Sequence, residues 1–174
     1  MKRLLIICLG LVLAACGGTA SKSAGTAIPT VDVASIGVSS FKATVTGAVS
    51  GDFSGTGSTF KQEGGGLLIS LVGTQGPSGA SVTIILPAGT AAGTYTPKSY
   101  ADAYDSAANK ITGIGASFSV LNKASGVDAY ATISEGTLTL QSVDPMTGSI
   151  HFKATIECGG EVEVQATFYQ LTPV

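Results

Sequence analysis

Alternation of apolar and polar residues is the main pattern in the chain after about residue 40. Phe41–Val49 alternates in this way, with the period of a strand that buries one face. Gly51-Asp52 interrupts the alternation, and Phe53–Lys61 follows as the partner segment. The pattern therefore predicts an antiparallel pair of strands at the start of the domain.

Two more alternating segments follow, Leu67–Gly73 and Ser81–Leu86, and the residues Gln75–Gly79 between them are typical of a turn. Some of the intervening positions are apolar as well: Leu68, Val72 and Ile85. These two strands are therefore expected to be buried on both faces and to lie at the centre of the fold.

The second half of the chain continues the alternation. Its predicted strands are 114–120, 127–133, 138–140 and 150–156. A tight turn is predicted at Glu135-Gly136, and a second turn at Asp144–Gly148, because both segments contain residues that favour turns. Strands joined by such short turns are expected to pair with their neighbours in the sequence.

The last hairpin permits a prediction of register, because directly opposed residues share a face of the sheet. A two-residue turn at Gly159-Gly160 would oppose Ile156 to Glu163, so it fails. A three-residue loop, Cys158–Gly160, has glycines for the left-handed position and opposes apolar residues throughout. The predicted pairs are Ile156 with Val162, Ala154 with Val164, Phe152 with Ala166 and Ile150 with Phe168, with Glu157 opposite Glu161 on the solvent face.

These strands predict an all-β domain, an antiparallel β-sandwich or small barrel of about eight to ten strands, with the sandwich preferred. The 24 glycines and the low share of charged residues, 11%, agree with many short strands and tight turns. A membrane-spanning barrel is the competing architecture. It is disfavoured because the chain lacks aromatic girdles and paired lipid-facing bands of about ten residues.

The first residues have a different pattern. Lys2 and Arg3 precede an apolar run, Leu4–Leu13, which is about half of the roughly 20 residues that a membrane-spanning helix needs. Such a charged start and short apolar run, followed by small residues, are the mark of a secretory signal. Leu13-Ala14-Ala15-Cys16 resembles the lipobox of bacterial lipoproteins. An ordinary secretory signal with a chance cysteine at residue 16 is the alternative.

The resemblance implies that residues 1–15 are removed as a signal peptide and that Cys16 becomes the first residue. Its sulfur would carry a diacylglycerol and its amine an acyl chain such as palmitate. Several buried chains anchor a protein stably, since a stable anchor needs at least two signals. In this family, an aspartate after the lipidated cysteine implies retention in the inner membrane. Residue 17 is a glycine instead, so the resemblance implies a place in the outer membrane of a Gram-negative cell envelope.

Processing leaves 174 − 15 = 159 residues, a length typical of one domain. Residues 16–39 are expected to be the lipidated N-terminus and a flexible tether of about 25 Å, with 31–38 as an alternative edge strand, and residues 40–174 a single β domain. The mature chain has 9 − 2 = 7 basic residues, all lysine, against 11 acidic ones, so no nucleic acid partner is expected. Cys158 remains as a single thiol, which excludes an internal disulfide.

A long irregular connection runs from Pro87 to about Lys110 and is long enough to be a functional loop. Its candidate ligand-binding residues are Tyr95, Tyr100, Asp102, Tyr104 and Asp105. Aromatic rings beside carboxylates suit a sugar-binding surface or a weak calcium site, although no EF-hand spacing is present. In the alternative interpretation, the tyrosines pack on the core and the acids are solvated.

No residue pattern predicts catalysis, a metal site or a cofactor. His151 is the single histidine and is expected on the solvent face of a strand; no Gly-x-Ser-x-Gly motif supports a catalytic triad. His151 lies too far back along the strand to act as a base for Cys158. Gly64–Gly66 is not followed by the Lys-Ser or Lys-Thr of a phosphate loop. We therefore expect that the protein is not an enzyme.

The Gly93-Thr94-Tyr95 turn and the late hairpins between Thr137 and Phe168 resemble a recurring type of uncharacterised all-β envelope lipoprotein. That resemblance brings no catalytic residues. The expected function is a lipid-anchored envelope protein with a structural or protein-interaction role, whose partners are the membrane and an envelope protein or glycan. The alternative is a ligand- or glycan-binding module that uses the loop 95–110.

Overall fold

The computed structural model describes residues 39–62, 65–75, 78–122, 127–157 and 159–173. The predicted signal peptide, the lipobox with Cys16, the tether up to residue 38 and Cys158 lie outside the described residues. The strands are β1 (Ser40–Gly47), β2 (Gly51–Lys61), β3 (Leu67–Gln75), β4 (Ser78–Leu86), β5 (Gly93–Tyr95), β6 (Lys98–Ser99), β7 (Tyr104–Asp105), β8 (Lys110–Ile111), β9 (Gly115–Asn122), β10 (Val127–Val143), β11 (Met146–Ile156) and β12 (Glu161–Pro173), with a short helix, α1 (Tyr100–Ala103).

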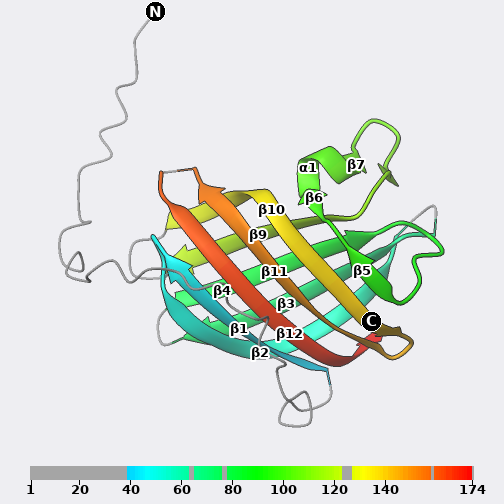
Figure 1. Ribbon diagram of the computed structural model, residues 1–174, viewed down its shortest axis with the longest axis horizontal. Helices are drawn as coiled ribbons and strands as arrows, with labels where there is room; N and C mark the ends of the chain where they lie inside the picture. The colour runs from blue at the N-terminus through cyan, green and yellow to red at the C-terminus, as the bar shows by residue number, and fades with distance from the viewer. Residues whose placement is uncertain (1–38, 63–64, 76–77, 123–126, 158, 174) are drawn as a thin grey trace, which may run out of the picture. The chain divides into compact units, whose positions relative to one another are not determined.

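Eight of these strands close into an antiparallel barrel (Figure 1). The order around the barrel is β1, β2, β3, β4, β9, β10, β11 and β12, so each strand pairs with the next long strand in the sequence. The barrel closes where β12 pairs with β1, from Tyr169 opposite Ser40 to Val162 opposite Gly47. The all-β prediction is confirmed, and the barrel is the correct one of the two architectures. The preference for a sandwich was wrong, because local alternation carries no information on whether the last strand meets the first.

Inward-facing side chains fill the barrel. In β1 the alternation places Phe41, Ala43 and Val45 inside and leaves Lys42 and Thr44 exposed. Phe118 and Phe152 meet across the interior with ring centroids 6.5 Å apart and an edge-to-face angle of 62°. The other large buried side chains of this core include Phe168, Ile69, Leu71, Ile84, Leu138 and Leu140. An eight-stranded barrel is just wide enough to be filled in this way.

The outward face is polar over most of β2, β3, β4 and β9. Ser58, Ser70, Thr83 and Ser117 form one row across the four strands. In a neighbouring row the hydroxyls of Ser81 and Ser119 lie 2.7 Å apart. Apolar side chains inside and polar ones outside are the reverse of the distribution in a barrel that crosses a bilayer.

The prediction of two buried faces for β3 and β4 was correct for Ile85 and wrong for Val72. Ile85 points outward and is nevertheless 1% exposed, whereas Val72 is 53% exposed. Leu68, also outward, is half-buried. The difference arises because residues 87–114, which we call the insertion, cover only one end of the outer surface of these strands.

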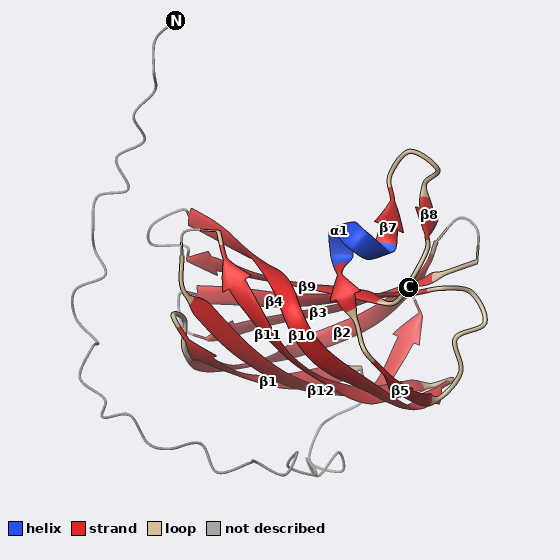
Figure 2. Cartoon of the chain, turned by 45° about the horizontal axis from the view of Figure 1, so that its top comes forward, coloured by secondary structure: helices blue, strands red, loops and turns tan. Residues whose placement is uncertain are grey.

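The insertion joins β4 to β9 and lies where the barrel wall divides (Figure 2). β9 and β10 pair only from Phe118 opposite Ala131 to Asn122 opposite Val127. Beyond this pairing, β9 pairs in parallel with β6 and the far part of β10 pairs with β5. β5 and β6 therefore continue the wall on either side of the division.

β10 is continuous through Glu135-Gly136, where a tight turn was predicted. Ile133 lies opposite Ala154 and Glu135 lies opposite Lys153, so Ser134 is an extra residue, a β-bulge. The bulge moves the inward positions from odd numbers, at Ile133, to even numbers, at Leu138. A break in the alternation is what a turn also produces, so the sequence pattern did not distinguish the two.

The β11–β12 hairpin has the predicted inward face but a different register. Ala154 lies opposite Val162, Phe152 opposite Val164 and Ile150 opposite Ala166, two residues from the predicted pairing. Thr155, not Glu157, lies opposite Glu161. A shift of two residues keeps every side chain on its face, so the apolar pattern alone cannot exclude it. Gly159 and Gly160 have φ of +90° and +107°, which confirms their predicted left-handed role.

Candidate functional site

The insertion is held to the barrel by a second, small apolar cluster. Ile85 of β4, Ala103 of α1 and Ile111 of β8 are its buried members. Leu68, Tyr100 and Tyr104 pack against them and stay partly exposed. The insertion is thus a structured element that packs on the outer surface of the barrel.

α1 is short and begins with a side-chain cap. Ser99 Oγ accepts a hydrogen bond from the Asp102 backbone N–H at 3.3 Å and donates one to Asp102 Oδ2 at 2.8 Å. This is the arrangement by which Ser stabilises a helix N-terminus. One carboxylate oxygen of the candidate residue Asp102 is therefore engaged in holding the first turn of α1.

The β7–β8 hairpin projects from the barrel (Figure 2) and uses the second candidate carboxylate. Asp105 Oδ1 accepts hydrogen bonds from the backbone N–H groups of Ala107 and Ala108, both at 3.0 Å. The Tyr104 hydroxyl donates to Asn109 Oδ1 across the same hairpin. These contacts order the turn from within.

Tyr100 and Tyr104 form a partly exposed pair whose ring centroids are 5.6 Å apart. Partial burial raises the pKa of the Tyr100 hydroxyl, and repulsion from Tyr104 raises it further. Tyr95 lies elsewhere: it is on β5 opposite Leu138, packs against the main core and donates a hydrogen bond to the Ala91 carbonyl at 2.8 Å.

The structure therefore brings four of the five candidate ligand-binding residues into one short segment and separates the fifth. Tyr100, Asp102, Tyr104 and Asp105 lie in α1 and β7, while Tyr95 belongs to β5. The tyrosines pack on apolar clusters and both acids are exposed, as in the alternative interpretation of this loop. Both acids also cap or order turns, which was not predicted.

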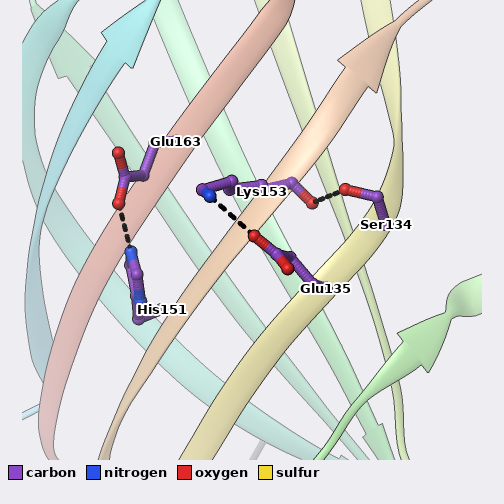
Figure 3. Close-up of polar contacts among 5 residues, drawn as sticks. All are labelled: Ser134, Glu135, His151, Lys153 and Glu163. Atoms are coloured by element: carbon purple, nitrogen blue, oxygen red, sulfur yellow. Dashed lines mark hydrogen bonds and ion pairs between the residues drawn. The ribbon is translucent and has the colours of Figure 1, made fainter.

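A row of paired charges crosses the outer face of β10, β11 and β12 (Figure 3). Lys153 Nζ lies 2.7 Å from Glu135 Oε1, and His151 Nε2 lies 2.6 Å from Glu163 Oε1. The hydrogen bond and charge of Lys153 lower the pKa of Glu135, and the same contacts with Glu135 raise the pKa of Lys153. His151 and Glu163 are 38% and 48% exposed, so this pair lies on an open surface, as predicted for His151.

A shallow depression of about 300 Å³ lies on the outer face of β1 and β2. Lys42, Thr44, Asp52 and Ser54 provide its outward side chains, and Thr44 donates a hydrogen bond to Asp52 Oδ1 at 2.8 Å. These residues are not among the candidate binding residues predicted from the sequence. Alternation along β1 and β2 predicts that these side chains share the outer face. It does not predict that they lie close together, because that depends on the β1–β2 register.

Among the described residues, no group of three or more His, Cys, Asp or Glu side chains is arranged to hold a metal ion. No helix in the described part of the chain is long and apolar enough to span a membrane. Comparisons with protein-family models, curated proteins and solved structures find no match for this chain.

Proposed function

We propose that the protein is a lipid-anchored component of the bacterial cell envelope, placed in the outer membrane, whose barrel acts without catalysis as a structural or protein-interaction module. The anchorage is supported by Lys2 and Arg3, the short apolar run and the lipobox ending at Cys16. The function of the barrel is supported by the geometry of its described residues.

The filled interior is the observation that carries this proposal. Barrels that bind small ligands enclose a cavity. In this barrel, inward side chains fill the interior, and those of Phe41, Phe118, Phe152 and Phe168 are at most 2% exposed. Recognition would then take place on the outer surface or at the ends of the barrel. Those surfaces are rich in Ser, Thr and paired charges, which suits contact with another polar surface.

The exposed chemistry also supports a function without catalysis. His151 is paired with Glu163 on an open strand face and not in a cleft that would exclude water from a reaction. In the insertion, Asp102 and Asp105 already bind Ser99 and backbone N–H groups. Because these two carboxylates already have hydrogen-bond partners, the insertion is a weaker candidate for a ligand site than its tyrosines and aspartates alone indicated.

Anchorage is tested with Cys16→Ala and the matched variant Cys158→Ala in the full chain. Radiolabelled palmitate should enter the wild-type protein and Cys158→Ala, and both should sediment with membranes. Cys16→Ala should lose the label and the membrane association. The proposed anchor would be contradicted if Cys16→Ala still incorporated palmitate and still sedimented with membranes.

The role of the barrel is tested by crosslinking in the intact envelope and by thermal unfolding of the mature protein with glycans, metabolites and divalent cations. We expect a discrete crosslinked protein and no thermal shift. A ligand at about 100 times its dissociation constant would add about 2.7 kcal/mol, a shift of several degrees. Such a shift, abolished by Tyr100→Ala or Tyr104→Ala and found without a crosslinked partner, would favour the ligand-binding alternative.

A further inference from the structure

The topology gives the two ends of the barrel different characters (Figure 1). One end, the hairpin end, carries the short connections β1–β2, β3–β4, β9–β10 and β11–β12. The other, the insertion end, carries the insertion, the connections β2–β3 and β10–β11, the start of β1 and the end of β12, where the hydroxyls of Ser39 and Thr172 lie 2.8 Å apart. The chain that leads from Cys16 therefore joins the barrel at the insertion end.

The outward apolar side chains of β2, β3 and β4 gather at this same end. Phe60, Leu68 and Ile85 stand side by side in one row across the three strands. The insertion covers Ile85 but leaves Leu68 and Phe60 partly exposed. The rows nearer the hairpin end consist mainly of Ser and Thr, with Val72 as the exposed apolar residue.

Tyr100 and Tyr104 extend this apolar row onto the insertion. Both rings pack on the small cluster around Ile85 and remain partly exposed. A tyrosine with an apolar ring and a polar hydroxyl suits the boundary between lipid headgroups and hydrocarbon. Phe60, Leu68, Tyr100 and Tyr104 together form what we call the aromatic patch.

Charge is also distributed unequally between the ends. At the insertion end, exposed Lys61, Lys98 and Lys110 are equal in number to exposed Asp102, Asp105 and Asp144, so these formal charges cancel. The β11–β12 hairpin at the other end exposes Glu157, Glu161 and Glu163, with Lys153 opposite Glu163. An anionic bilayer would therefore repel the hairpin end more strongly than the insertion end.

We propose that the insertion end docks on the bilayer that holds the lipid anchor, with the aromatic patch at the headgroups and Lys61, Lys98 and Lys110 facing anionic phosphates. This inference rests on the proposed lipidation of Cys16. The tether predicted from the sequence spans only about 25 Å, so the barrel stays near the membrane surface. Docking directs the hairpin end, with its acidic side chains, away from the bilayer and toward partners.

The first test is a lysine footprint of the full mature lipoprotein in vesicles of phosphatidylethanolamine and phosphatidylglycerol. A water-soluble acetylating reagent is applied, and the labelling of each lysine is divided by that of Lys42, which lies on the outer face of β1. The reference is the unlipidated Cys16→Ser protein in solution. We expect several-fold protection of Lys61, Lys98 and Lys110 in vesicles and none for Lys153.

The second test uses the absence of tryptophan from the chain. Phe60→Trp places one indole in the aromatic patch, and Thr155→Trp places a matched indole at the exposed outer face near the hairpin end. In vesicles with brominated acyl chains, the emission of Phe60→Trp should shift to the blue and lose intensity. The emission of Thr155→Trp should be unchanged.

Lysine substitutions in the Phe60→Trp background test the charge contribution. Each of Lys61→Gln, Lys98→Gln and Lys110→Gln should weaken docking to anionic vesicles roughly fivefold, and Lys42→Gln should have no such effect. In protein that floats with the vesicles, two results together would contradict the docking: equal labelling of all these lysines and no quenching of Phe60→Trp. The anchorage would then still stand. Failure of the wild-type protein to float with vesicles would overturn the anchorage and the inference that rests on it.

Discussion

Individual glycines determine how closely the large side chains pack inside the barrel. At Gly73 a Cβ atom would lie 2.8 Å from Cζ of Phe41, and at Gly148 it would lie 2.9 Å from Cζ of Phe168. Both glycines face inward among buried residues. Small residues opposite large ones are how a narrow barrel accommodates its rings. The glycine-rich composition therefore contributes to core packing as well as to turns.

Gly148→Ala should destabilise the barrel, because the new Cβ would lie 2.4 Å from the Thr139 carbonyl oxygen and the strands would have to move apart. We expect a loss of about 1–3 kcal/mol, with the melting temperature falling by about 2–4 °C per kcal/mol. Thermal unfolding followed by circular dichroism measures the change.

The control is Gly113→Ala, whose Cβ would meet only Ala103 Cβ, at 3.9 Å. This substitution should change the stability by no more than about 0.5 kcal/mol. Equal melting temperatures for Gly148→Ala and Gly113→Ala would contradict the close packing at residue 148.

At the scale of elements, the insertion is a locally ordered unit attached to a rigid wall. Its β5 and β6 pair with β10 and β9, whereas residues 100–111 are held by the small cluster around Ile85 and Ile111, the Ser99 cap and the turn at Asp105. Few apolar contacts hold such a segment, so it should open more easily than the barrel strands. The aromatic patch depends on this unit, because two of its four residues, Tyr100 and Tyr104, belong to it.

Ser99→Ala should loosen the insertion without unfolding the barrel. Loss of the helix cap costs about 1 kcal/mol, which corresponds to roughly fivefold faster opening of the segment 100–111. Hydrogen exchange with mass spectrometry should show this acceleration, while amides of β3 and β11 keep their wild-type rates. Ser106→Ala, in the exposed turn, is the control, and an unchanged exchange rate in Ser99→Ala would show that the cap is unimportant.

Much of each element could be predicted from the sequence, because alternation depends only on the buried face. Ala154, Val162 and Val164 were correctly placed inside, although the register was shifted by two. The bulge at Ser134, the short strands β5 and β6 and the exposure of Val72 were missed. Each of these depends on which segment packs beside another, and that information is not local in the sequence.

At the scale of the whole molecule, closure gives each of the eight long strands a partner on both sides, although β10 is paired on its β9 side only at residues 127–131 and 138–140. Among the described strands, the free edges therefore belong to residues 132–137 of β10 and to the short strands β5, β6, β7 and β8. A partner strand could therefore pair only with these short segments. Closed barrels avoid edge-to-edge aggregation for the same reason. Partners would thus recognise mainly side chains on the surface, since the free backbone groups are confined to these short segments.

The adjacent ends of β1 and β12 predict that the barrel tolerates circular permutation. A short glycine linker from residue 173 to residue 39, with new termini in the exposed β1–β2 turn near Ser50, should preserve the strand content and cooperative unfolding seen by circular dichroism. A permutant opened in the middle of β3, at buried Leu71, should fail to fold. Failure of the first permutant as well would contradict the closure of β12 on β1.

The pairing of β12 with β1 also has a consequence for the time course of folding. Ser40 and Tyr169 are direct partners although almost the whole domain separates them in the sequence. Contacts between such distant segments form slowly, because the chain entropy of closing the intervening loop is lost before the contact stabilises anything. When the chain folds from its N-terminus, one side of β1 stays without its partner until the last strand is available. An unpaired strand edge promotes aggregation, so the folding chain is most prone to aggregate in the interval before β12 pairs with β1.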